Sequence, residues 1–141
     1  MEEREEFYTL KGYWQKDSVP LTPAMEDYLE MICRLGADSF PVRVKRLAEA
    51  LHVKPSSVTK NIQALRTGGY IIAKRYGAIE LTEKGREEGA YLLYRHDVLF
   101  RFLCFLNGTG NELRQTERIE HFVDRETVFN LERVMEKWAE K

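Results

Sequence analysis

The chain has 141 residues, of which 43% are hydrophobic and 32% are charged, as is typical of a helix-rich protein with a real core. Its two cysteines indicate no disulfide scaffold, and no apolar run approaches membrane-spanning length. The acidic N-terminus lacks the pattern of a secretory signal, so we expect a cytoplasmic protein without a membrane partner.

Charge is distributed unevenly along the sequence. Residues 1–40 hold four Lys/Arg and nine Asp/Glu, a net charge of −5. Residues 41–86 hold ten Lys/Arg and three Asp/Glu, a net of +7, and residues 87–141 hold eight and eleven, a net of −3. A basic middle between acidic ends indicates one module that meets a polyanion, although charge alone leaves a chance fluctuation open.

The first predicted elements form a helix-turn-helix. Pro23, preceded by a threonine, is typical of a helix start, and this helix is expected to stop near Gly36. Two helices over 42–51 and 55–67 follow, joined by a short connector, which is the helix-turn-helix pattern. Residues 1–20 precede them as either a docked arm or a mobile tail.

A hairpin and three helices complete the chain. Residues 70–75 and 78–81 predict two strands around a Tyr-Gly turn, which would form a wing. A long helix is expected from Glu83 to about residue 106, followed by helices over 112–122 and 125–138.

We therefore expect a mainly α protein in three parts. An N-terminal arm spans 1–21, a winged helix-turn-helix DNA-binding domain spans 22–89, and a helical dimerisation and metal-binding domain spans 90–141. Apolar residues on the last helices predict a homodimer, with an intramolecular core as the alternative; these are Leu113, Phe122, Val128, Phe129, Leu131, Val134, Met135 and Trp138.

The helix over 55–67 carries the predicted DNA-reading surface. Its apolar stripe faces the core, and its opposite face holds short polar and basic side chains that fit the major groove. Two basic residues lie at the predicted wing tip. A solvated surface, or a winged helix that binds only protein, remains the alternative. The predicted DNA-binding residues are Ser56, Ser57, Thr59, Lys60, Gln63, Lys74 and Arg75.

Six potential metal ligands have spacings that fit helix faces. Two acids three residues apart lie on the first helix, one histidine lies on the long helix, and an i, i+3, i+4 group lies on the penultimate helix. Four carboxylates and two imidazoles suit Mn²⁺, Fe²⁺, Co²⁺ or Zn²⁺. Singly, each residue could instead be a helix-capping acid, a core histidine or part of a surface ion pair. The six are Asp27, Glu30, His96, Glu117, Glu120 and His121.

Five stretches carry a resemblance to a known family. They are MEDYLE (25–30), VKPSSVTK (53–60), LTEKG (81–85), YRH (94–96) and ERIEH (117–121). Together they resemble the diphtheria-toxin-repressor family, specifically its manganese-transport-regulator branch. The resemblance covers residues 22–139 and departs from the family over 1–20.

The resemblance implies a function and a metal. The six candidate ligands fall on the ligand positions of that branch, where a binuclear site forms. Iron-responsive relatives carry Met at the position of Asp27 and Cys at that of Glu117, so the oxygen ligands of this sequence favour Mn²⁺. The binuclear site of the family implies two ions per subunit. Fe²⁺, Co²⁺, Zn²⁺ and Cd²⁺ are the alternatives.

The expected protein is a manganese-responsive repressor of metal-uptake genes. As the resemblance implies, a homodimer would bind a palindromic double-stranded DNA operator. The alternatives are an iron- or zinc-responsive repressor and a metal-independent winged-helix regulator. A binuclear metalloenzyme is a further class, but no nucleophile pair or HExxH pattern supports it, so we expect neither an enzyme nor a small organic substrate.

Overall fold

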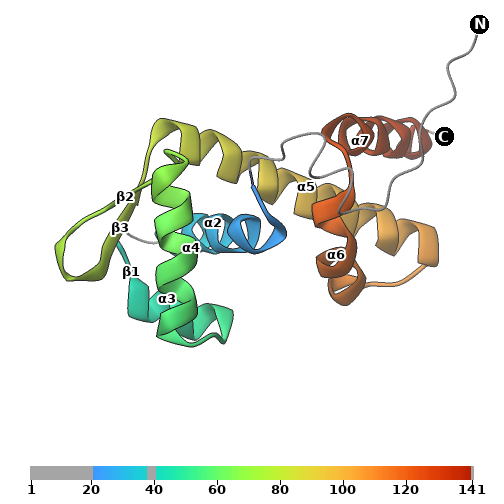
Figure 1. Cartoon of the computed structure of the whole chain (residues 1–141). Helices are drawn as coiled ribbons and strands as arrows, with labels where there is room; N and C mark the ends of the chain where they lie inside the picture. Colours follow the sequence, from blue (N-terminus) through green and yellow to red (C-terminus); the bar gives the residue numbers. More distant parts are fainter. Residues whose placement is uncertain (1–20, 38–40, 141) are drawn as a thin grey trace, which may run out of the picture.

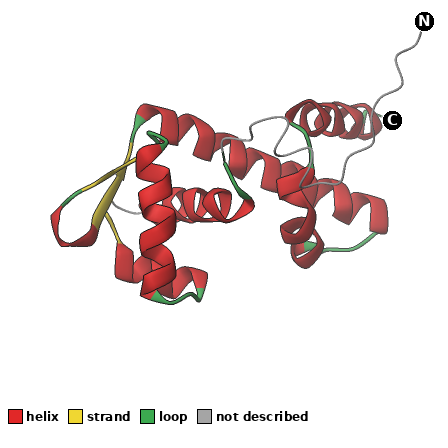
Figure 2. Cartoon of the chain, in the orientation of Figure 1, coloured by secondary structure: helices red, strands yellow, loops and turns green. Residues whose placement is uncertain are grey.

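The computed structural model describes residues 21–37 and 41–140, which form six α-helices and one small sheet (Figure 1). Residues 1–20 of the predicted arm lie outside this description. Strand is confined to the wing at one end of the molecule, and helices make up most of the rest (Figure 2). The mainly α prediction is therefore confirmed.

Helix α2 (Pro23–Gly36) begins as its sequence predicts. The hydroxyl oxygen of Thr22 accepts a hydrogen bond of 3.1 Å from the backbone N–H of Met25, which caps the helix. Tyr28, Leu29 and Ile32 are buried on one side, where α2 packs against α3, α4 and α5. Its other side carries the acidic residues.

The helix-turn-helix consists of α3 (Val44–Leu51) and α4 (Pro55–Thr67). His52 turns the chain between them in the left-handed conformation, with a φ of 56°. The apolar stripe of α4 is buried as predicted, since Val58 and Leu65 are inaccessible to solvent. This stripe fixes which side of α4 faces away from the core.

The wing is a three-stranded antiparallel sheet in the order β1-β3-β2. Strands β2 (Ile71–Ala73) and β3 (Ala78–Leu81) form the predicted hairpin. The sequence predicted a helix from Val42, but Val42–Arg43 pair with β3 as strand β1, so α3 starts two residues later. Arg43 donates a 3.0 Å hydrogen bond to the carbonyl of Tyr76 and so connects the wing tip to β1, directly before α3.

Helix α5 (Glu83–Asn107) connects the two ends of the molecule (Figure 1). Its first half packs on α2 and the sheet, and α6 (Leu113–Ile119) and α7 (Arg125–Ala139) pack against it farther along. The helix predicted over 112–122 is shorter, because its last turn tightens into a 3₁₀ segment, η2 (Glu120–Phe122). None of the described helices is long and apolar enough to span a bilayer.

Candidate metal centre

The six predicted ligands converge where α2, α5 and the α6–η2 segment meet. Five of them form two groups, Asp27–Glu120–His121 and Glu30–His96–Glu120, each with potential ligand atoms within 4.8 Å of one another. The sixth, Glu117, lies outside both groups, with its Oε1 3.4 Å from Nδ1 of His96. Glu120 belongs to both groups and its side chain is 0% exposed. These six side chains are called the candidate metal centre below.

One group is arranged around His96 on α5. Its Nδ1 lies 2.8 Å from Oε2 of Glu120, 3.4 Å from Oε1 of Glu117 and 3.7 Å from Oε1 of Glu30. Glu30 is buried, whereas Glu117 is half exposed at the rim. Three carboxylates, one from α2 and two from the α6–η2 segment, therefore face one imidazole nitrogen.

The second group is arranged around His121 in η2. Its Nε2 lies 2.9 Å from Oδ1 of Asp27 and 3.9 Å from Oε1 of Glu120. That Glu120 oxygen is buried and has no hydrogen-bond partner among the described residues. A buried, unpartnered carboxylate oxygen is costly, so this atom fits a role as a ligand for a cation.

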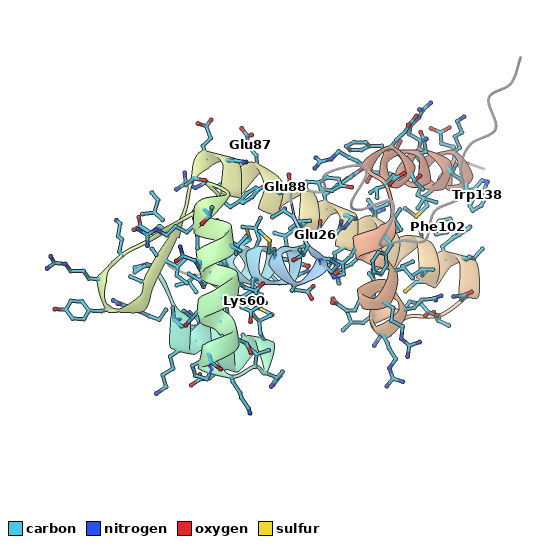
Figure 3. The ribbon with its side chains drawn as sticks, viewed as in Figure 1. Glu26, Lys60, Glu87, Glu88, Phe102 and Trp138 are labelled. Atoms are coloured by element: carbon cyan, nitrogen blue, oxygen red, sulfur yellow. The ribbon has the colours of Figure 1, made fainter. Side chains whose placement is uncertain are left out.

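Two residues outside the six, Glu26 and Arg95, form hydrogen bonds beside the candidate metal centre. Neither of them was predicted from the sequence. The other ring nitrogen of His121, Nδ1, forms a 2.9 Å hydrogen bond with Oε1 of Glu26 on α2. Arg95, only 4% exposed, contacts both Glu26 oxygens at 3.1 and 3.4 Å. Arg95 could have been found from its position, because it lies on the same side of α5 as the buried Leu92 and Leu99. Figure 3 labels Glu26 where α2 approaches α5.

Charges in the candidate metal centre shift one another's protonation. Burial disfavours the imidazolium of His121, but hydrogen bonds and charges from Asp27 and Glu26 outweigh it and raise its pKa to about 10. The hydrogen bond from Nδ1 of His96 to the Glu120 carboxylate raises the pKa of that histidine above its ordinary value. Burial, together with the charge of Glu120, raises the pKa values of Glu30 and Glu117. The carboxylates thus favour the protonated form of both histidines, most strongly that of His121.

The donor set is suited to a first-row divalent cation. Carboxylate oxygens and imidazole nitrogens from three elements meet within reach of one another, and no thiolate takes part among the six. His121 uses Nδ1 to contact a carboxylate while Nε2 faces the candidate metal centre, the usual arrangement of a metal-binding histidine.

The predicted DNA-binding residues lie on a separate surface. Ser56, Ser57, Thr59, Lys60 and Gln63 are exposed on α4, where Figure 3 labels Lys60.

The two predicted wing residues differ from each other. Lys74 and Arg75 are both exposed, but Lys74 forms a 2.8 Å ion pair with Glu80 on β3. The charge of Lys74 is therefore partly offset. Tyr76, which the sequence reasoning did not single out, is 91% exposed at the wing tip.

Comparison with known proteins agrees with this fold. Residues 20–79 match the family model described as iron dependent repressor, N-terminal DNA binding domain. A solved structure of the metal-dependent transcriptional regulator MtsR superimposes with a TM-score of 0.73 at 28% identity, covering 82% of this chain and 55% of that one. The chain thus spans about half the length of that structure. The class of protein is a winged-helix, DNA-binding transcriptional regulator.

Two curated relatives narrow the class. The HTH-type transcriptional regulator MntR of Geobacillus kaustophilus is 45% identical over 101 residues, 71% of this chain and 72% of that protein. MntR of Shouchella clausii is 40% identical over 108 residues, 76% of each chain. The chain belongs to the diphtheria-toxin-repressor family, in its MntR-like branch, which confirms the resemblance seen in the sequence.

His121 predicts a pH dependence of stability in the metal-free protein. Its folded pKa of about 10 lies above the ordinary 6.5, so its imidazolium stabilises the fold fully below pH 6.5 and ceases to do so as pH rises through about 10. We expect the free energy of unfolding, measured by urea denaturation in a chelator, to fall across this window more in wild type than in His121→Asn. A pH-independent difference between the two proteins would contradict this.

Proposed function

We propose that this protein is a manganese-responsive transcriptional repressor that controls metal-uptake genes and is not an enzyme. The convergence of four carboxylates and two histidines at one place in the fold, with Glu120 buried among them, carries the proposal. The protein would act in the cytoplasm on double-stranded DNA, without a membrane or a small organic substrate as partner.

The ligands would be the four carboxylates and two histidines of the candidate metal centre. Two divalent ions would supply four positive charges, which match Asp27, Glu30, Glu117 and Glu120 when both histidines are neutral. Glu120 belongs to both groups and is placed to serve two ions. Two ions per subunit is therefore the expected stoichiometry.

The oxygen ligands of the candidate metal centre favour Mn²⁺. Asp27 and Glu117 provide oxygen at positions where a thioether or thiolate would favour softer ions. Mn²⁺ is the weakest binder in the Irving–Williams series, so Fe²⁺, Co²⁺, Zn²⁺ or Cd²⁺ can bind without giving the same geometry. Selectivity would then lie in the response of DNA binding rather than in affinity alone.

Metal binding would be coupled to DNA binding through α2. Asp27 and Glu30 lie on α2, which packs against both helices of the helix-turn-helix, whereas the other four ligands lie on α5 and the α6–η2 segment. Bringing these ligands together fixes α2 relative to the far half of α5. The position of α4 in each subunit would be fixed with it, at a spacing suited to successive major grooves about 34 Å apart on a palindromic operator.

A homodimer is supported by an exposed apolar surface in the second half of the chain. Large apolar side chains there are 37–59% exposed, although their neighbours on the same helices, such as Val128, are buried. Phe105 on α5 stacks on Trp138 of α7 with ring centroids 4.9 Å apart. A monomer rarely leaves so many large apolar side chains in water. The proposed dimer surface consists of Phe105, Leu106, Leu113, Phe122, Phe129, Val134 and Trp138.

Removing the central carboxylate tests the metal and its coupling to DNA. In Glu120→Gln we expect the Kd for Mn²⁺ to rise by about 100-fold or more, and metal-dependent operator binding to disappear with it. Fluorescence anisotropy with Mn²⁺, Fe²⁺, Co²⁺, Zn²⁺ and Cd²⁺, together with elemental analysis, would measure both. Operator DNA should lower the wild-type Kd for Mn²⁺ by the same factor by which Mn²⁺ lowers that for DNA.

Glu126→Gln is the matched control, since Glu126 is exposed in the first turn of α7 and is not one of the proposed ligands. Equal Mn²⁺ affinity with and without operator DNA would reject the coupling. Unchanged Mn²⁺ binding in Glu120→Gln would reject the metal site.

Lys60 tests the DNA-reading surface. Lys60→Ala should weaken operator binding by about 1–3 kcal/mol if the side chain reaches a base edge, and should reduce the salt slope by about one if it contacts a phosphate. Lys137→Ala removes the same charge from the last turn of α7 as a control. Equal losses in the two variants at several salt concentrations would reject a specific role for α4.

Leu106 tests the dimer surface. This side chain is 59% exposed near the end of α5, so a charge there should prevent self-association without affecting the folded subunit. Sedimentation equilibrium at micromolar concentration should show a wild-type dimer and a Leu106→Glu monomer. Ile72→Glu, on the wing, should remain a dimer. A wild-type monomer would contradict the prediction.

A further inference from the structure

Arg34 forms an ion pair with one of the proposed ligands. It lies in the last turn of α2, one helical turn after Glu30, and its Nη2 donates a 2.8 Å hydrogen bond to Oε1 of that carboxylate. The same oxygen faces His96 Nδ1 at 3.7 Å. The guanidinium of Arg34 is therefore hydrogen-bonded to the same Glu30 oxygen that faces His96 in the candidate metal centre.

Arg34 lies at the surface, where its side chain can move away from Glu30 into solvent. Its side chain is 44% exposed, whereas that of Glu30 is 8% exposed. A cleft of about 200 Å³ is lined by Arg34 together with Asp27, Glu30 and Glu117. Rotation of a long surface side chain into water requires no movement of α2, so the ion pair can be broken locally.

Arg95 has a different role, although it is also part of this region. It is buried and contacts both oxygens of Glu26, which is not among the six proposed ligands. Its interaction with Glu26 joins α2 to α5 and can persist when ions bind. Arg34 instead competes for an oxygen that an ion needs.

We propose that Arg34 is a built-in competing cation that sets the affinity of the candidate metal centre. In the metal-free protein its guanidinium compensates the charge of Glu30, and it must withdraw from Oε1 when an ion takes that ligand. This inference rests on the proposed metal-binding function. It assigns Arg34 an effect opposite to that of the ligands, because its loss tightens metal binding.

The two states of the protein should respond to loss of Arg34 with opposite signs. Without metal, the neighbouring carboxylates lose a counter-charge, so the fold becomes less stable. With metal, an obstacle to coordination and a repulsive positive charge are both removed, so affinity increases. A nonspecific perturbation of α2 would instead weaken both folding and metal binding.

The test measures Mn²⁺ binding by Arg34→Gln using isothermal titration calorimetry and elemental analysis. We expect the Kd to fall by about threefold to tenfold, the range expected for loss of one partly exposed ion pair, with an unchanged ion count. The melting temperature in a chelator should decrease. Arg34→Lys keeps the positive charge and should stay close to wild type in metal affinity.

Arg101→Gln is the matched control. Arg101 forms the same kind of i, i+4 ion pair, 2.8 Å from Asp97, and is 45% exposed, but its acidic partners are not among the six proposed ligands. Its loss should leave the Kd for Mn²⁺ unchanged.

The outcomes separate this inference from the proposed function. Wild type that binds Mn²⁺, with Arg34→Gln unchanged or weaker, overturns the role of Arg34 alone. Equal tightening in Arg101→Gln or Arg34→Lys also overturns it, because the effect would then not depend on a cation at Glu30. Failure of wild type to bind any of the five divalent metals overturns both proposals.

Discussion

The structure depends on compensating one buried carboxylate. Glu120 is inaccessible to solvent, and a buried carboxylate is stable only if positive charge or hydrogen-bond donors surround it. Its nearest charged neighbours are His96 and His121, and each of these is held in turn by other acids. In the metal-free protein the raised pKa values of both histidines favour the protonated imidazoles, and with the proposed ligands a proton and a metal ion would compete for the same nitrogen atoms. The contact between α2 and the α6–η2 segment is consequently electrostatic. Its strength depends on whether protons or a cation neutralise the carboxylates.

Helix α2 has two faces with different roles. Its apolar face is part of the core that includes Leu47 of α3 and Leu65 of α4, and its acidic face contributes to the candidate metal centre. The helical period of 3.6 residues separates these faces on a single short element. The DNA-binding half of the molecule therefore cannot move independently of the acids that approach α5. With the proposed ligands, this dual use of one helix would couple metal binding to operator binding without any additional connecting segment.

The sequence predicted what periodicity and spacing encode. The helix-turn-helix and the hairpin follow from apolar stripes and turn residues. The acids on α2 and the group on the α6–η2 segment follow from residues three and four apart, whereas His96 and the full set of six are what the family resemblance implies. Strand β1 was missed because two residues carry no periodic signal, and its pairing with β3 depends on tertiary contact. The 3₁₀ turn over Glu120–Phe122 was missed because three residues are also too few to give a periodic signal. Burial of Arg95 could be inferred from its helical face, but its ion pair with Glu26 was missed because two residues 69 apart leave no local pattern.

Helix α5 belongs to both halves of the molecule without interruption, from Glu83 to Asn107. At 1.5 Å per residue its 25 residues span about 37 Å, so a tilt of about 5° at one end displaces the other by about 3 Å. That displacement is comparable to the length of a hydrogen bond to a base edge. In the proposed homodimer, an adjustment too small to alter the packing of either half would thus decide whether the two copies of α4 match the pitch of a duplex. Rigidity of this rod, more than mobility of any loop, would make the regulator sensitive to its ligand.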